Sequence, residues 1–122
     1  MNYRLMKEMY HEFRYDIDDY AFPLVATKGD VVVKEVRDGE DVVGFLLVDD
    51  GYVDCLYVRE RYRRKGLAGK AVREYVFEHG LPQTIHIVNS NHVAQKFWKT
   101  VFKMDVISRN EVDTFYAIRG LV

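Results

Sequence analysis

Hydrophobic residues recur with helical spacing between positions 67 and 79. Five of them fall at i, i+3, i+4, i+7 and i+8, which places them on one face of a helix. They are Ala68, Ala71, Val72, Tyr75 and Val76. Gly80 and Pro82 follow, and both residue types are typical of a helix end. The pattern predicts an amphipathic helix from about Leu67 to His79.

Apolar runs of strand length lie on both sides of this helix. Residues 31–37, 42–48 and 52–58 are separated by Asp-Gly turn signals, so they predict a three-stranded antiparallel meander. A short run at 84–88 follows the helix. Because a crossover helix normally joins parallel neighbours, we expect the strands at 52–58 and 84–88 to lie side by side.

The two ends of the chain add further elements. Residues 3–20 have helical spacing, and their polar side ends in an acidic cluster. This cluster is Glu12, Asp16, Asp18 and Asp19. A second helix is expected after the N-cap candidates in Asn89-Ser90-Asn91, with apolar residues from Ala94 to Phe102 on one face, followed by β-like segments at 105–109 and 114–119. The elements together predict a mixed α/β (α+β) fold, in which helices flank a largely antiparallel sheet.

Composition limits the classes of function. The chain has 122 residues, of which 48% are hydrophobic, so we expect one domain over residues 1–122 with one core. The formal net charge is −1, which indicates neither a nucleic-acid nor a membrane partner. Residues 1–58 nevertheless carry a net charge of −7 and residues 59–73 one of +6. This asymmetry suits an anionic cofactor that meets a cationic co-substrate, although each charge taken singly is more simply a solvated surface residue.

The cysteine and histidine content argues against several kinds of site. The one cysteine, Cys55, excludes an intramolecular disulfide, and its apolar strand favours a packed side chain over a nucleophile. The four histidines are scattered without metal-ligand spacing, so we expect no metal. No apolar run approaches the length of a membrane span, and residues 1–8 are too charged for a signal peptide. We therefore expect a cytoplasmic protein.

The start of the predicted helix carries the candidate chemistry. Gly66, Leu67 and Ala68 leave the first backbone N–H groups without side-chain cover, and their partial positive charge favours an anion. Three cations come directly before them, Arg63, Arg64 and Lys65. The stretch predicts a phosphate-binding loop; the alternative is a simple glycine turn beside a solubilising basic loop.

Three motifs in this order resemble the GNAT superfamily of acetyl-CoA-dependent N-acetyltransferases. Arg63 to Ala68 resembles the family's R/Q-x-x-G-x-G/A signature, and Leu56-Tyr57-Val58 resembles the L-x-V that precedes it. Downstream, Asn91-x-x-Ala94-x-x-Phe97-Trp98 is similar to the family's N-x-x-A-x-x-L/F-Y helix. The resemblance covers about residues 31–119.

The resemblance implies a GNAT-like fold and direct transfer of an acetyl group from acetyl-CoA to an amine in a ternary complex. The family's opening strand has no obvious counterpart here, which leaves open whether the sheet has that strand. By the same resemblance, strand 52–58 parts from its neighbour to pair with the pantetheine arm, and amides across 64–69 hold the pyrophosphate. The expected cofactor-binding residues are Leu56, Tyr57, Val58, Arg63, Arg64, Lys65, Gly66, Leu67, Ala68, Gly69, Asn91 and Trp98.

Acetyl transfer needs a neutral amine, and an alkylamine with a pKa of about 10.4 is mostly protonated at pH 7, so a base or water chain must collect its proton. Bases of the family are often carboxylates on the strand that is 52–58 here, where Asp54 is the sole acid. Strict alternation places Asp54 with Tyr52 and Leu56, whereas a bulge would reverse this. The alternative is a solvated surface aspartate. Tyr57 is a candidate acid, or its backbone N–H a candidate oxyanion donor.

Two positions depart from the family pattern. Trp98 stands where many relatives have a tyrosine that protonates the departing thiolate, which indole cannot do. A thiol with a pKa of about 8.5 that leaves as an anion near pH 7 costs roughly 2 kcal/mol, so the reaction is slowed rather than forbidden. Tyr57, Tyr116 or water are alternative acids. Phe102 stands in place of a glycine, which either tightens the helix end or marks a register slip.

Three classes of function follow. The leading one is an N-acetyltransferase that acts on a small-molecule or peptide amine. The alternative is a GNAT-fold acyl-CoA-binding protein with weak or lost catalysis. A nucleic-acid binder is the weakest, because no aromatic-interleaved basic surface accompanies the basic loop. A sheet without its first strand would also cover its exposed edge by pairing, which predicts a homodimer.

Overall fold

The computed structural model describes residues 4–5, 7–9 and 31–122. Most of the helix expected over residues 3–20, with its acidic cluster, lies outside them, as does any strand within residues 10–30. The described elements are β1 (Val31–Asp38), β2 (Asp41–Asp49), β3 (Tyr52–Val58), the 3-10 helix η1 (Glu60–Tyr62), α3 (Leu67–His79), β4 (Thr84–Val88), α4 (His92–Val101), β5 (Phe102–Arg109) and β6 (Asp113–Leu121).

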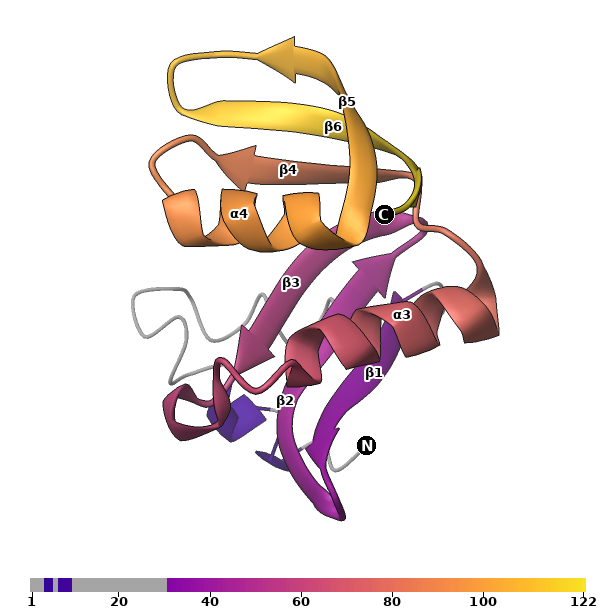
Figure 1. Cartoon of the computed structure of the whole chain (residues 1–122), viewed down its shortest axis with the longest axis vertical. Helices are drawn as coiled ribbons and strands as arrows, with labels where there is room; N and C mark the ends of the chain where they lie inside the picture. Colours follow the sequence, from indigo (N-terminus) through magenta and orange to yellow (C-terminus); the bar gives the residue numbers. More distant parts are fainter. Residues whose placement is uncertain (1–3, 6, 10–30) are drawn as a thin grey trace.

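The described strands form one sheet in the order β1-β2-β3-β4-β6-β5 (Figure 1). All neighbouring strands run antiparallel except β3 and β4, which are parallel. The meander and the parallel pair joined by a crossover helix are thus confirmed. The helix predicted from Leu67 to His79 is confirmed at both ends as α3.

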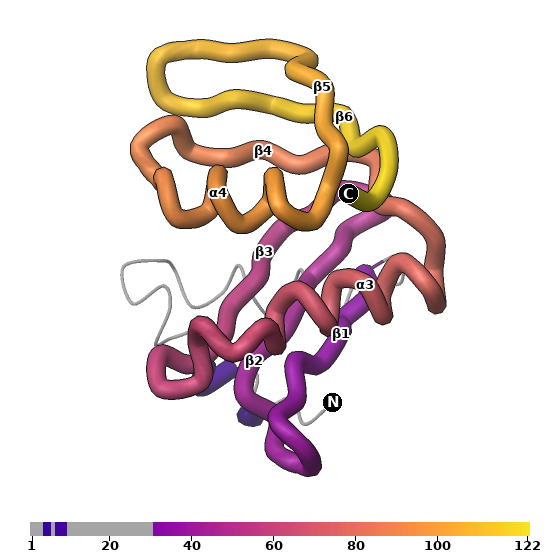
Figure 2. The backbone as a smooth tube through the Cα atoms, viewed as in Figure 1, coloured from indigo at the N-terminus to yellow at the C-terminus, as the bar shows by residue number. Residues whose placement is uncertain are grey.

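Both helices cover the same face of the sheet, α3 across β1 and β2 and α4 beside β4 (Figure 2). The main core lies between them and the sheet, where Val72 and Tyr75 of α3 and Trp98 of α4 pack on strand residues such as Val53 and Ile85. A smaller cluster lies on the other face. It contains Met9, Phe45, Leu47, Cys55 and Tyr57. The expected packed role of Cys55 is therefore confirmed.

The C-terminal hairpin is longer than predicted. β5 begins at Phe102 rather than 105, because the backbone of Phe102 is extended (φ −115°, ψ 142°) and pairs with Leu121. The chain passes from α4 into β5 without a connecting turn, so no glycine is needed there. The fully buried Phe102 ring continues the core instead.

Among the described residues, no helix is both long and apolar enough to cross a bilayer. Within the same part of the chain, no three His, Cys, Asp or Glu side chains gather where they could hold a metal ion.

Candidate functional site

The start of α3 has the backbone geometry of an anion site. Gly66 is the N-cap residue in the left-handed conformation (φ 76°, ψ 6°), and Arg64 two residues earlier also has a positive φ of 64°. Within the described residues, no side chain caps this end and no acidic residue occupies the first turn. A loop of this kind turns successive N–H groups toward one point, which favours a bound anion. A Cβ built on Gly66 meets no atom within 4 Å, so the approach to the loop is open.

Arg63 fixes this loop to the end of β3. Its Nε donates a 2.7 Å hydrogen bond to the carbonyl oxygen of Val58, and its guanidinium carbon lies 5.6 Å from the centre of the Tyr57 ring. This places the helix start beside the last residue of the strand. Arg64 and Lys65 are exposed at the same turn, with the Lys65 ammonium 5.5 Å from the ring centre of Tyr62.

β3 separates from β4 after a short parallel contact. Within the described residues, the two strands pair only at Tyr52 with Thr84 and at Val53 with Ile85. From Cys55 to Val58, β3 is paired on its other side with β2, and from Asp54 onward it has no register with β4. Figure 1 shows the two strands fanning apart, with the start of α3 at the open end. The expected parting of the strand at Leu56 to Val58 is therefore confirmed.

A bulge in β3 settles the question of alternation. Leu47 of β2 is opposite Cys55 and Val48 is opposite Val53, so Asp54 is an extra residue in the strand. Leu56 consequently packs against the helix side of the sheet, whereas Tyr52 contacts His86 on the other face. Of the two alternatives, strict alternation and a bulge, the structure therefore has the bulge, and Tyr52 and Leu56 lie on opposite faces. Asp54 is exposed at the bulge, and its role as a base stays a prediction.

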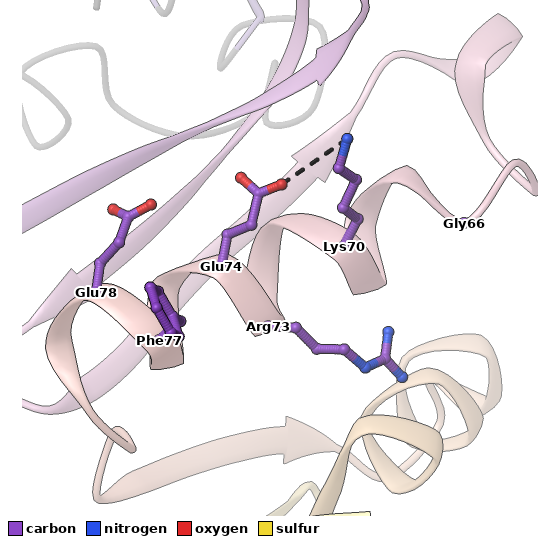
Figure 3. Close-up of a pocket in the computed structure, with 6 residues that line it drawn as sticks. All are labelled: Gly66, Lys70, Arg73, Glu74, Phe77 and Glu78. Atoms are coloured by element: carbon purple, nitrogen blue, oxygen red, sulfur yellow. Dashed lines mark ion pairs between the residues drawn. The ribbon is translucent and has the colours of Figure 1, made fainter.

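Among the described residues, two shallow hollows run along α3. One of these hollows has a volume of about 510 Å³ and begins at residues 63–66, the anion-site loop (Figure 3). Its lining residues are Gly66, Lys70, Arg73, Glu74, Phe77 and Glu78. Arg73 extends away from Lys70 and Glu74, and its Nη1 lies 2.7 Å from where a Cβ on Gly69 would stand. Because Gly69 has no side chain, the guanidinium group of Arg73 has room beside the first turn of α3.

The two expected cofactor contacts on α4 have structural roles. The Asn91 side chain caps the helix by accepting a 3.0 Å hydrogen bond from the N–H of Ala94. Trp98 is 6% exposed and stacks on Phe102 at a centroid distance of 5.7 Å. Asn91 thus stabilises the start of α4, and Trp98 packs α4 against the sheet. A contact of either residue with a cofactor stays a prediction.

The structure also assembles a cluster that the sequence analysis missed. The hydroxyl of Tyr52 is hydrogen-bonded to Nδ1 of His86, and Nε2 of His86 lies 3.7 Å from Oδ1 of Asp113. These residues come from β3, β4 and β6, so their meeting depends on the order of strands in the sheet. The one local signal was the alternation of His86 with two isoleucines, which places its side chain on the face away from the core.

The comparisons with known proteins agree with this fold. The family described as "Acetyltransferase (GNAT) family" matches residues 2–102. Among solved structures, the Campylobacter jejuni N-acetyltransferase PseH in complex with acetyl coenzyme A has a TM-score of 0.67 at 14% identity, over 98% of this chain and 92% of that one. Arabidopsis thaliana NAA60 in complex with a bisubstrate analogue has a TM-score of 0.61 at 18% identity, over 94% and 92%.

An acetyltransferase from Thermus thermophilus has a TM-score of 0.65 at 15% identity, over 84% of this chain and 72% of that one. No curated protein matches the sequence significantly. At such identities the solved structures establish the fold alone. The family match, however, spans most of the sequence, and the chain therefore belongs to the GNAT family of acetyltransferases.

Proposed function

We propose that the protein is an N-acetyltransferase that moves an acetyl group from acetyl-CoA to an amine by direct attack in a ternary complex. One observation carries the proposal: the uncapped, left-handed start of α3 lies at the open end of the β3–β4 gap. A diphosphate and an extended pantetheine arm need an anion site next to a strand that parts from its neighbour, and β4 parts from β3 after Val53. Membership of the family and the acetyl-CoA complex of PseH support the same function.

The residues present fit the diphosphate and the arm. Backbone amides from Arg64 to Gly69 would hold the diphosphate, assisted by the side chains of Arg64 and Lys65. Leu56, Tyr57 and Val58 would offer backbone groups on the side of β3 that β4 leaves. The carbonyl of Val58 already accepts the Arg63 bond, but a carbonyl oxygen has a second lone pair.

The protein's part in the reaction is to orient the two substrates and stabilise charge. The neutral amine attacks the thioester carbon, and a backbone N–H near Tyr57 or Val58 would stabilise the oxygen that becomes negative. CoA then leaves as a thiolate.

Binding of the cofactor is tested by the substitution Gly66→Glu. Acetyl-CoA at about a hundred times its Kd should stabilise the wild type by about 2.7 kcal/mol, which raises the melting temperature by several degrees. A carboxylate at the anion site should abolish this shift. Gly39→Glu is the matched control, since Gly39 also has a positive φ (62°) with no atom within 4 Å of a Cβ. Its acetyl-CoA shift should stay.

Equal shifts in the wild type and Gly66→Glu would contradict the proposed binding site. A shift with an oligonucleotide in place of acetyl-CoA would favour the nucleic-acid alternative. The second candidate, an acyl-CoA-binding protein with weak catalysis, is favoured by Trp98, whose buried indole cannot protonate a thiolate. Release of free thiol on addition of an amine library separates the two, because a binding protein releases none above the rate of hydrolysis.

A further inference from the structure

A phenol, an imidazole and a carboxylate lie in series on the sheet face away from α3 and α4. The Tyr52 hydroxyl is hydrogen-bonded to Nδ1 of His86, and Nε2 of His86 is 3.7 Å from Oδ1 of Asp113. A carboxylate beside Nε2 favours a proton on that nitrogen. Nδ1 is then the basic nitrogen, and it faces the phenol.

Packing holds the imidazole in this orientation. The His86 ring stacks on Phe115 at 5.3 Å and lies nearly parallel to the Tyr52 ring, with 3° between the planes. Ile85 and Ile87 on either side are buried in the main core. The His86 side chain is still 36% exposed and that of Asp113 26%, so water and a substrate can reach the cluster.

The cluster lies at the closed end of the β3–β4 gap. Tyr52 and Val53 are the last residues of β3 that pair with β4, and His86 directly follows Ile85, the last paired residue of β4. A pantetheine arm that entered beside Gly66 and followed β3 would direct its thioester toward this point. In that arrangement the phenol and the imidazole would lie near the bond that reacts.

We propose that Tyr52 and His86 together take the proton of the acceptor amine, with Asp113 as the positioning residue for His86. This rests on the proposed acetyl transfer. The amine nitrogen forms a bond to the thioester carbon and gives a proton to the Tyr52 oxygen, while the phenol proton passes to Nδ1 of His86. The C–S bond then breaks, its electron pair leaves with CoA as thiolate, and the products are an amide, the thiolate and an imidazolium beside Asp113.

The test compares Tyr52→Phe and His86→Gln with the wild type in acetyl-CoA affinity and in thiol release with a reactive amine. General-base catalysis contributes about 10²–10⁴-fold, so both variants should lose roughly that factor in kcat with acetyl-CoA affinity within about twofold. His79→Gln is the matched control, because His79 is an exposed histidine at the far end of α3. It should keep its turnover.

The pH profile separates proton transfer from a structural role. In the described residues, the ionisable groups that face the imidazole are Tyr52 from β3 and Asp113 from β6. The fall of wild-type kcat/KM toward acid pH should become less steep in His86→Gln, which keeps only the part that protonation of the amine itself causes, and Asp113→Asn should move the midpoint of the part that His86 adds. A structural role would change neither.

Each contrary outcome has a distinct meaning. If the wild type fails to bind acetyl-CoA, the result contradicts both the proposed function and the proton relay, which is the proposed proton transfer through Tyr52 to His86. If it turns over but Tyr52→Phe and His86→Gln retain full kcat, the relay alone is overturned. The relay is also overturned if these variants lose affinity and melting temperature in parallel with rate, or if Asp54→Asn removes turnover while His86→Gln does not.

Discussion

Trp98 has a packing role that its chemistry alone would not suggest. Its indole is 6% exposed, stacks on Phe102 and meets Phe97 edge-on at 5.0 Å. A tyrosine at this position would have a smaller ring and would bring a hydroxyl group toward the core. The residue therefore joins α4 to the start of β5, whatever it contributes beside the cofactor.

We expect Trp98→Tyr to lower the free energy of unfolding by about 1–3 kcal/mol without raising turnover, because the buried ring loses packing. Urea denaturation and thiol release measure the two effects. Trp98→Phe is the control, since it lacks the indole and the hydroxyl alike. If Trp98→Tyr reacts about thirtyfold faster than Trp98→Phe, the ring faces the departing sulfur, because about 1.5 pKa units correspond to that factor.

At the residue scale, the sequence predicts what local patterns encode. The uncapped start of α3 could be placed from the sequence because Gly66 comes directly before apolar residues with helical spacing. The left-handed conformation of a glycine and the spacing of apolar residues in a helix both depend on the local sequence. The cluster of Tyr52, His86 and Asp113 is not local. Its members are separated by whole elements, and only the strand order β3-β4-β6 brings them together.

The helix that carries the anion site is fixed to the sheet by an ion-pair group. Nζ of Lys34 on β1 lies 2.7 Å from Glu78 and 3.0 Å from Glu74, both on α3, and its side chain is 17% exposed. The hydrogen bond with Glu78 raises the pKa of Lys34 above its ordinary value of 10.5. The same bond lowers the pKa of Glu78 below 4.5.

These directions set the pH range in which Lys34 stabilises the fold. A lowered carboxyl pKa gives stability that is present above pH 4.5 and is lost as pH falls through the folded value. A raised ammonium pKa gives stability that is present below pH 10.5 and is lost as pH rises past the folded value. The ion pair between Lys34 and Glu78 therefore contributes fully to the free energy of unfolding between pH 4.5 and pH 10.5, and this contribution is lost at more acidic and at more basic pH.

Lys34→Met should lower the melting temperature near pH 7, and the difference from the wild type should shrink below about pH 4. Thermal denaturation monitored by circular dichroism across this range measures it. Arg37→Met is the control, because Arg37 pairs at 3.0 Å with Glu35 on its own strand. A difference for Lys34→Met that stays constant from about pH 3 to about pH 8 would contradict an electrostatic origin.

At the element scale, the predictions fail where two periodicities overlap. Phe97, Trp98, Val101 and Phe102 fit a helix, yet Phe102 also begins the strand β5, whose pairing with Leu121 decides the boundary. The bulge at Asp54 is similar, since the sequence allows both alternation and a bulge. Only the register with β2 distinguishes them.

At the scale of the whole molecule, opposite charges are segregated along the chain. The stretch 59–73 has a net charge of +6 and forms η1, the anion-site loop and the first half of α3. Within the described sheet, β1 and β5 are the edge strands, and Val106 and Ile107 on β5 are 55% and 58% exposed. The expected homodimer stays a prediction. The charge pattern, in contrast, has a direct consequence for cofactor binding.

We expect the affinity for acetyl-CoA to fall as salt rises, because exposed cations at the loop attract the phosphates through solvent. Isothermal titration between about 0.05 and 0.5 M NaCl should show Kd rising on the order of threefold or more, since the Debye length shortens over this range. Arg64→Gln should weaken binding at low salt and reduce the salt dependence, because one cation at the loop is removed.

Arg119→Gln is the matched control for this change in charge. Arg119 pairs with Asp105 at 3.0 Å on the β5–β6 hairpin, and its substitution should leave both the affinity and its salt dependence as in the wild type. If Arg64→Gln and Arg119→Gln have equal effects, the general charge of the molecule rather than the loop attracts the cofactor. An affinity that does not change with salt would show that backbone amides hold the diphosphate without help from the basic side chains.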